Sequence, residues 1–223
     1  MNLPNYLTLS RIASIPLLIF LLSPKLHWFA EVLKMPWLAK PGNPELIAAG
    51  LFILASITDG VDGYLARRWN QVTTLGMLLD PLADKLMVAG AFIALVQFNP
   101  DIVPAWIAVL VIAREFLVSG LRSIASAEGF TIEASDLGKF KMVVQIVAIV
   151  AAIIHHHWRF LDLYIFNLDL DVEFVARTAM WFMVGISLIS AADYFIGFWK
   201  KIDRSAQKAR RKPFVLSRKK TSG

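Results

Sequence analysis

Long apolar stretches alternate with short polar or proline-containing connections along the chain. These stretches predict six helices, near residues 5–23, 45–66, 75–98, 102–126, 138–157 and 173–199. Each is close to the ~20 residues that an α-helix needs to cross the hydrocarbon layer of a membrane. The segment 24–44 contains four prolines and predicts a loop, with a short interfacial piece around Trp28–Trp37. The pattern therefore predicts an all-α, polytopic membrane protein with six transmembrane helices.

The composition strengthens this prediction and limits what else the chain can contain. Hydrophobic residues make up 57% of the 223 residues, and the mean hydropathy is +0.59, whereas a soluble domain is roughly 45–50% apolar. Six helices use almost the whole length, so we expect a membrane domain at residues 1–200 and a basic, disordered tail at 201–223. The absence of cysteine excludes disulfides, thiolate catalysis and cysteine-ligated zinc.

Lysine and arginine are unevenly distributed between the two ends of the predicted helices. If the N-terminus is cytoplasmic, the outer side holds only Lys25, Lys34, Lys40 and Arg159, whereas ten basic residues follow from position 200 onward on the inner side. Because cytoplasmic segments carry the excess of positive charge, both termini are predicted to be cytoplasmic, with the protein in the inner (cytoplasmic) membrane. The tail is expected either to lie against anionic headgroups or only to set the orientation. Nucleic-acid binding is not expected.

Four aspartates, Asp59, Asp62, Asp80 and Asp84, fall within 26 residues of this apolar sequence. Their spacings put each pair on one helix face, at the end of the second predicted helix and near the start of the third. The connection at 68–75 is short, so the two helices are expected to be antiparallel neighbours whose carboxylates meet near the inner surface. Ionised carboxylates in lipid are costly, and one or two divalent cations would compensate their charge. Oxygen ligands of this kind fit Mg²⁺ or Mn²⁺ better than zinc.

Residues between the acids add features of a phosphate site. Gly63 directly follows Asp62 and suggests room for a substrate beside the metal. Arg67 lies about 140° further round an ideal helix than Asp62, and it can reach a phosphate with two parallel hydrogen bonds. A metal site, an arginine and an exposed inner rim together indicate phosphoryl-group chemistry.

The spacing of these residues also resembles a known signature. The pattern D-x2-D-G-x2-A-R-x8-G-x3-D-x3-D, typical of the CDP-alcohol phosphatidyltransferase family, is matched without a gap by Asp59, Asp62, Gly63, Ala66, Arg67, Gly76, Asp80 and Asp84. Eight fixed positions make this match highly specific. Further segments resemble the bacterial phosphatidylglycerophosphate synthase branch of the family, at 5–11, 66–71, 80–85, 113–115, 119–122 and 137–141. The similarity covers about residues 1–150.

This resemblance implies a fold and a reaction. Members of the family are six-span, usually homodimeric membrane enzymes with a polar cavity that opens to the cytoplasm. They transfer the phosphatidyl group of CDP-diacylglycerol to an alcohol and release CMP. In the branch that this chain resembles, the alcohol is glycerol 3-phosphate and the product is phosphatidylglycerol phosphate.

The resemblance also implies roles for individual residues. Asp59, Asp62 and Asp80 would be the main metal ligands. Asp84 would be either a further ligand or the general base that deprotonates the attacking hydroxyl. The CDP pocket would be lined by Asp59, Asp62, Gly63, Ala66, Arg67 and Gly76.

Basic residues in the fourth and fifth predicted helices are candidates for binding the phosphate of the acceptor. These are Arg114, Arg122 and Lys139, with Lys141 beside them. Arg114 and Arg122 are about 80° apart on an ideal helix, so both can face one cavity. Arg122 and Lys141 could instead extend to the inner headgroups. Glu115 is expected either to neutralise Arg114 or to tie its helix to another.

Polar residues elsewhere are expected to have structural roles. The side chains of His155–His157 diverge by about 100° per residue on a helix, which favours a boundary rather than a shared metal ion. The acidic residues between positions 162 and 173 are expected in a solvated outer loop. Asp193, within the last predicted helix, is expected to pair with a cation inside the bundle or to make a structural hydrogen bond.

Two alternatives remain open from the sequence. A different acceptor, such as inositol phosphate, serine, inositol or phosphatidylglycerol, would keep the family and change the product. A cation transporter could use intramembrane carboxylates as its ion site. Such a site usually lies near the middle of the bilayer, whereas these aspartates cluster at predicted helix ends.

Overall fold

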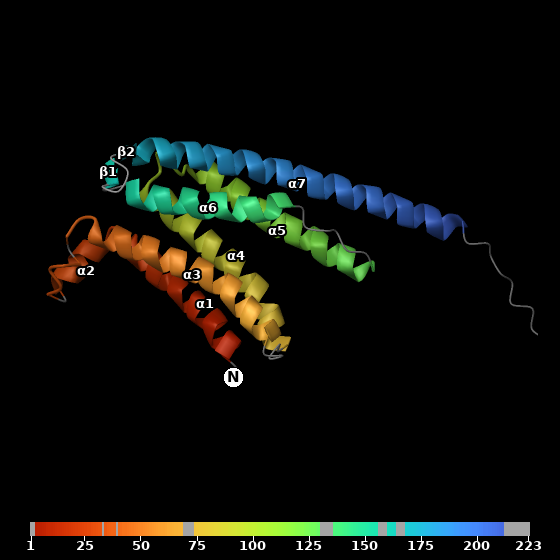
Figure 1. Ribbon diagram of the computed structural model, residues 1–223, viewed down its shortest axis with the longest axis horizontal. Coiled ribbons are helices and arrows are strands. Elements are labelled where there is room, and N and C mark those ends of the chain that lie inside the picture. Colours follow the sequence, from red (N-terminus) through yellow and green to blue (C-terminus); the bar gives the residue numbers. More distant parts are fainter. Residues whose placement is uncertain are drawn as a thin grey trace, which may run out of the picture.

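The computed structural model of the protein describes residues 3–32, 34–38, 40–68, 74–129, 136–155, 160–163 and 168–211. This part of the chain forms seven helices and one two-stranded antiparallel hairpin (Figure 1). The helices are α1 (Leu3–Leu21), α2 (Leu26–Val32), α3 (Asn43–Arg68), α4 (Thr74–Phe98), α5 (Ala105–Ala127), α6 (Asp136–His155) and α7 (Val172–Arg211). The strands β1 (Phe160–Leu163) and β2 (Leu168–Asp171) directly precede α7.

All six helices predicted from the apolar stretches are present, as α1, α3, α4, α5, α6 and α7. Their bounds differ by a few residues for identifiable reasons. For example, α5 begins at Ala105 rather than 102, because Pro104 takes an extended backbone conformation (φ −64°, ψ 151°) as the residue before the helix. The last helix is longer than predicted, since α7 continues beyond 199 to Arg211, into the segment expected to be a disordered tail. Residues 212–223 lie outside the described residues.

The connections hold two short elements, one of which the sequence analysis expected. The expected interfacial piece contains the short helix α2, which covers Trp28 but ends before Trp37, and both tryptophans are exposed. The expected outer loop between 162 and 173 is wrong in part, because β1 and β2 pair there, with Asp162 opposite Asp169. Asp171 ends the hairpin and caps α7, where its Oδ1 accepts hydrogen bonds from the backbone N–H groups of residues 173 (3.0 Å) and 174 (3.3 Å).

The long helices pack as two groups that share a boundary (Figure 1). In one group, α1 packs against both α3 and α4. In the other, α7 packs against both α5 and α6. Contacts of α3 with α6 and of α4 with α5 join the two groups. The bundle is helical throughout, and the hairpin is a small addition at one of its ends.

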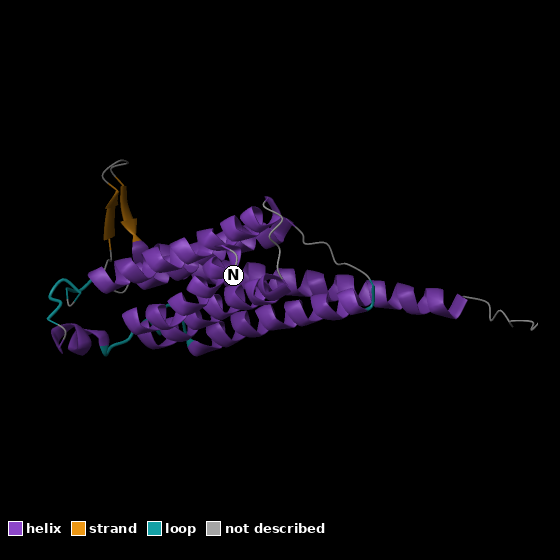
Figure 2. Ribbon diagram, turned by 90° about the horizontal axis from the view of Figure 1, so that it is seen from below, coloured by secondary structure: helices purple, strands orange, loops and turns teal. Residues whose placement is uncertain are grey.

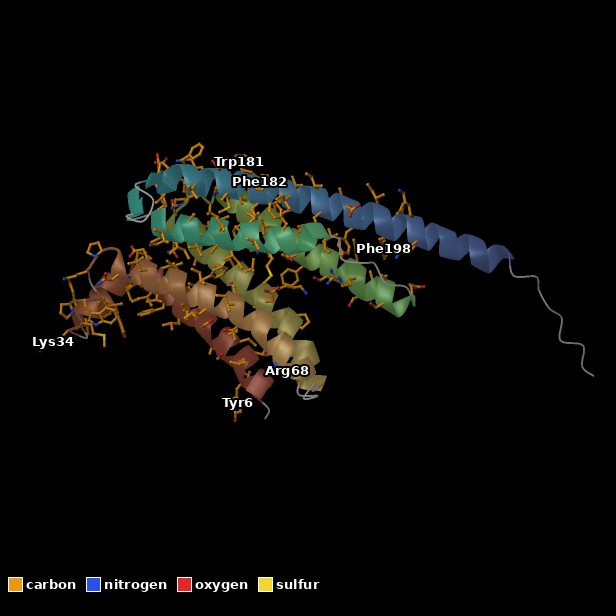
Figure 3. All side chains as sticks on the ribbon, in the orientation of Figure 1. Tyr6, Lys34, Arg68, Trp181, Phe182 and Phe198 are labelled. Atoms are coloured by element: carbon orange, nitrogen blue, oxygen red, sulfur yellow. The ribbon has the colours of Figure 1, made fainter. Side chains whose placement is uncertain are left out.

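The two ends of the bundle carry different elements. The hairpin and α2 lie at one end in both orthogonal views (Figures 1 and 2). Figure 3 shows Tyr6 near the start of α1 close to Arg68 at the end of α3, and both are far from Lys34. The end of α3 and the start of α4 therefore lie at the end opposite the hairpin, as expected for antiparallel neighbours.

The core between the two groups is apolar and closely packed. Its largest fully buried side chains include Leu18, Phe52, Phe92 and Ile149, which come from α1, α3, α4 and α6. Where α1 crosses α4, a Cβ atom added to Gly90 would lie 2.7 Å from Cγ2 of Ile15. The glycine therefore permits a close approach of these helices, a common use of small residues where helices pack in membranes.

The outer surface of the bundle is rich in exposed apolar side chains. Leu54, Val109 and Ile189, on α3, α5 and α7, are each more than 60% exposed, and Trp181 and Phe182 project from α7 (Figure 3). Within the described residues, Val172–Ile202 of α7 is the one helix long and apolar enough to cross a membrane by length and composition alone. Shorter apolar helical segments are Tyr6–Leu21, Asn43–Thr58 and Phe140–His155. Apolar surface of this extent indicates a membrane or protein partner.

Candidate active site

A cavity of about 740 Å³ lies where the two helix groups meet, and residues of α3, α4, α5, α6 and α7 line it. Its charged lining residues are Asp80, Asp84, Lys85, Arg114, Glu115, Arg122 and Lys141. The structure therefore brings together four residues that the sequence analysis had assigned to two different subsites. Asp80 and Asp84 were expected at the metal, and Arg114 and Arg122 at the acceptor phosphate.

Acidic side chains occupy the α4 wall of the cavity. Asp80 and Asp84 are one helical turn apart, both line the cavity, and both are partly buried. The buried hydroxyl of Thr8, on α1, donates a 2.5 Å hydrogen bond to Oδ1 of Asp80. This bond orients the carboxylate, and Thr8 is a contributor that the sequence analysis missed. Two carboxylates of this kind supply the oxygen donors that a hard divalent cation prefers.

The other half of the predicted metal and CDP site belongs to α3. Asp59, Asp62, Gly63, Ala66 and Arg67 all fall within this helix, but their side chains lie outside the described part of the structure. Gly76 is buried near the start of α4. Among the side chains that are described, no three acidic or histidine residues gather as metal ligands. The four-aspartate metal site thus stays a prediction. The structure shows only that Asp80 and Asp84, the two aspartates on α4, line the same cavity.

Basic side chains of α5 and α6 also line the cavity, and two of them share one carboxylate. Glu115 on α5 forms an ion pair with its neighbour Arg114 (3.1 Å) and a second with Lys141 on α6. Arg114 also donates a 2.6 Å hydrogen bond from Nη2 to the hydroxyl of Ser190 on α7. The side chains of Arg114 and Lys141 are only 9% and 7% exposed. Both roles proposed for Glu115 are therefore filled, since it neutralises Arg114 and ties α5 to α6.

A second arginine lies further along α5. Arg122 donates a 2.6 Å hydrogen bond from Nη2 to the hydroxyl of Tyr194 on α7. Its guanidinium carbon also lies 5.5 Å from the centre of the Tyr194 ring, within the range of a cation–π contact. Arg122 and Lys141 both line the cavity and have polar partners there, which favours a role in the site over extension to the headgroups.

Comparison with known proteins decides the family. The model of the CDP-alcohol phosphatidyltransferases matches residues 1–189, which include α1 to α6 and the first half of α7. The chain belongs to the CDP-alcohol phosphatidyltransferase family. The matched range contains the complete aspartate signature and the basic residues of α5 and α6.

Curated relatives narrow this similarity within the CDP-alcohol phosphatidyltransferases. A protein of Bacillus subtilis is 41% identical over 206 residues, which cover 92% of this chain and 98% of the relative. A protein of Rickettsia bellii is 37% identical over 195 residues, which cover 87% of this chain and 93% of the relative. Both relatives are named CDP-diacylglycerol–glycerol-3-phosphate 3-phosphatidyltransferase.

Other residues that the sequence of this CDP-alcohol phosphatidyltransferase singled out lie away from the cavity or outside the described residues. Lys139 lies in α6, but its side chain is outside the described residues, so its role stays a prediction. Asp193 is exposed and does not line the cavity, so the expected place inside the bundle is wrong. Its neighbour Tyr194 lines the cavity instead. His155 ends α6, in agreement with a boundary position, and residues 156–157 lie outside the described range.

An apolar groove adjoins the charged cavity. It has a volume of about 390 Å³ and is lined by residues of α3, α6 and α7, among them Ile53, Val150 and Val175. Ile146 lines both the groove and the charged cavity. The site therefore combines a polar compartment with an apolar extension, which suits a ligand with one charged and one hydrocarbon part.

Proposed function

We propose that this protein transfers the phosphatidyl group of CDP-diacylglycerol to glycerol 3-phosphate, giving phosphatidylglycerol phosphate and CMP in phospholipid biosynthesis. Membership of the CDP-alcohol phosphatidyltransferases and the names of relatives at 34–41% identity support the reaction. The observation that carries the proposal is the single cavity with carboxylates on α4 and cations on α5 and α6. A donor site and an acceptor site that share one cavity can bring their two substrates into contact.

The charge of the cavity supports the use of two phosphate-bearing substrates. Among the described lining residues, four are basic (Lys85, Arg114, Arg122 and Lys141) and three are acidic (Asp80, Asp84 and Glu115). If Asp59 and Asp62 also face the cavity, the acids outnumber the bases by one. A divalent cation would then restore a positive balance, which is what anionic substrates require.

A divalent metal fits the donor set available here. Asp59, Asp62 and Asp80 would hold one or two Mg²⁺ or Mn²⁺ ions, and Asp84 beside them would act as the base. The neighbouring Gly63, Ala66, Arg67 and Gly76 would form the CDP pocket. Phe52 and Ser56 line the cavity from α3, and Asp59 follows Ser56 by three residues, so helical periodicity supports a position on the same side. When bound, the metal supplies stabilisation of negative charge on the CMP leaving group.

The protein residues supply the remaining chemistry. Asp84 accepts the proton of the attacking hydroxyl of glycerol 3-phosphate, while that oxygen forms a bond to the phosphorus that carries the diacylglycerol. The bond from this phosphorus to the oxygen of CMP breaks, and CMP leaves. The hydrogen bond from Thr8 keeps the Asp80 carboxylate oriented during this exchange. A carboxylate base in this position contributes typically ~10²–10⁴-fold to the rate.

The cationic wall is proposed to bind the phosphate of the acceptor. Arg114, Arg122 and Lys141 line the cavity, and Lys139 lies three residues before Met142, which also lines it. A cluster of this kind favours glycerol 3-phosphate over serine or inositol, which carry no phosphate. Inositol phosphate remains the alternative acceptor that satisfies the same cluster. A cation transporter is disfavoured by the match to the CDP-alcohol phosphatidyltransferase family and by the basic residues in the same cavity, which suit anionic substrates.

The apolar groove is proposed to hold hydrocarbon of the donor lipid. It begins at Ile146, beside the charged cavity, and continues to Ile154 and Val172 toward the hairpin end of the bundle. An acyl chain placed there would lie along the helices while the pyrophosphate remains in the polar compartment. The donor would thus reach the site without leaving the membrane.

We further propose six transmembrane helices in the inner (cytoplasmic) membrane, with both termini and the cavity on the cytoplasmic side. The exposed apolar side chains of α3, α5 and α7 support contact with lipid. The basic residues Arg67 and Arg68 at the cavity end of α3 support its cytoplasmic placement. A homodimer is proposed on the family resemblance alone.

Measurement of CMP release with different acceptors tests this assignment. Purified protein in detergent would be given CDP-diacylglycerol, Mg²⁺ and, separately, glycerol 3-phosphate, inositol phosphate, inositol or serine. We expect release with glycerol 3-phosphate and none with the acceptors that lack a phosphate. Preferential release with inositol phosphate would keep the family and overturn the proposed acceptor.

A further inference from the structure

We propose that Ser190 and Tyr194 of α7 are positioning residues, which hold Arg114 and Arg122 ready for the phosphate of the acceptor. This inference rests on the proposed function, and it adds the last helix to the binding machinery. Both residues line the cavity, but they lie just beyond residues 1–189, the range matched by the family.

The contacts form two parallel links between α5 and α7. Arg114 donates to the Ser190 hydroxyl and Arg122 to the Tyr194 hydroxyl, both at 2.6 Å. Ser190 and Tyr194 are four residues apart, so they present their hydroxyls on one face of α7. Each residue is buried, at 3% and 6% exposure. Because the two helices pack directly against each other, the links fix which side of α5 the guanidinium groups occupy.

Such links matter because arginine side chains are flexible. A free arginine loses about 2 kcal/mol of rotamer entropy when it is immobilised. A guanidinium already held by a neutral hydroxyl has lost part of this freedom before the substrate arrives, so binding costs less. The hydroxyls of Ser190 and Tyr194 carry no charge, so they can hold the arginines without neutralising them. Glu115, in contrast, both holds and neutralises Arg114.

Removal of a single hydroxyl tests the proposal. Tyr194→Phe keeps the ring and its contact with the Arg122 guanidinium but removes the hydrogen-bond acceptor. A hydrogen bond to a charged group corresponds to about ten-fold or more in binding. We therefore expect KM for glycerol 3-phosphate to rise about ten-fold, with KM for CDP-diacylglycerol unchanged and the thermal unfolding temperature lowered only slightly. Ser190→Ala is expected to act in the same direction through Arg114.

Ser187→Ala is the matched control. Ser187 is also buried on α7, one turn before Ser190, but it contacts the sulfur of Met183 and does not line the cavity. Its loss should leave KM for glycerol 3-phosphate unchanged. If Ser187→Ala raises this KM as much as Tyr194→Phe does, the effect reflects general loosening of α7 and the proposal is overturned.

A double-mutant cycle separates positioning from a direct role. If Tyr194 acts through Arg122, then Tyr194→Phe should have no further effect in an Arg122→Gln background. Additive effects of the two substitutions would contradict positioning.

Equilibrium binding of glycerol 3-phosphate, measured by calorimetry without CDP-diacylglycerol, provides a readout that does not depend on turnover. Weaker binding by Tyr194→Phe than by the wild type supports the proposal, and equal binding overturns it. Absence of wild-type turnover with glycerol 3-phosphate, by contrast, would overturn the proposed function and leave the binding result to decide the role of Tyr194.

Discussion

Asp84 is the residue on which the proposed proton transfer depends. It lies one turn beyond Asp80 on α4 and faces the same cavity as the acceptor arginines. Asp84→Asn preserves the size of the side chain but removes its capacity to take a proton. We expect CMP release to fall by about 10²–10⁴-fold. The thermal unfolding temperature in detergent serves as the control and should stay near that of the wild type. Substantial turnover by this variant would rule out Asp84 as the base.

At the residue scale, the sequence identified several residues of the cavity, but it did not predict which of them contact each other. Asp80, Asp84, Arg114 and Arg122 could be chosen because charges in apolar helices indicate function. Tyr194 could not, because its link to Arg122 joins positions 72 residues apart. Asp193 was predicted to lie inside the bundle because it is charged. Neighbouring residues on a helix diverge by about 100°, however, and helix packing places Tyr194 rather than Asp193 at the cavity.

Gly90 sets the distance between α1 and α4, the two helices that orient Asp80. The added Cβ of Gly90→Ala would meet the branched side chain of Ile15, which has little rotamer freedom. We expect overpacking to destabilise the fold by about 1–3 kcal/mol, seen as a lower thermal unfolding temperature. Gly185→Ala is the control, since a Cβ there would meet no atom within 4 Å.

Ile15→Ala removes the methyl group that the new side chain would meet. Combined with Gly90→Ala, it should recover part of the lost stability. If Gly90→Ala and Gly185→Ala unfold at the same temperature, the close approach of α1 and α4 does not limit stability as described.

At the element scale, hydrophobic patterning located six of the seven described helices, because a run of apolar residues long enough for a membrane has few alternatives to a helix. The ends depended on features that the pattern does not contain. Helix α5 begins only after Pro104, and α7 continues through the polar sequence after Trp199 to Arg211. The hairpin before α7 was missed, since its strands are only four residues each.

For the whole molecule, the membrane topology can be tested by labelling single introduced cysteines, because the chain contains none of its own. Lys34 and Arg68 are exposed and lie at opposite ends of the bundle (Figure 3). In spheroplasts, Lys34→Cys should react with a membrane-impermeant maleimide, whereas Arg68→Cys should react only after lysis. Each single-cysteine variant must first retain CMP release. Labelling of Arg68→Cys in intact spheroplasts would contradict a cytoplasmic cavity.

Because carboxylates and basic side chains line one cavity, the whole molecule is predicted to transfer the phosphatidyl group rather than to hydrolyse CDP-diacylglycerol. The most direct measurement is mass spectrometry of the lipids formed from CDP-diacylglycerol and ¹³C-labelled glycerol 3-phosphate, with Mg²⁺ or with excess EDTA. We predict a labelled phosphatidylglycerol phosphate whose amount equals the CMP released, and its loss with EDTA. Release of CMP with phosphatidic acid and no labelled lipid would contradict the account, as would labelled product that forms equally well in EDTA.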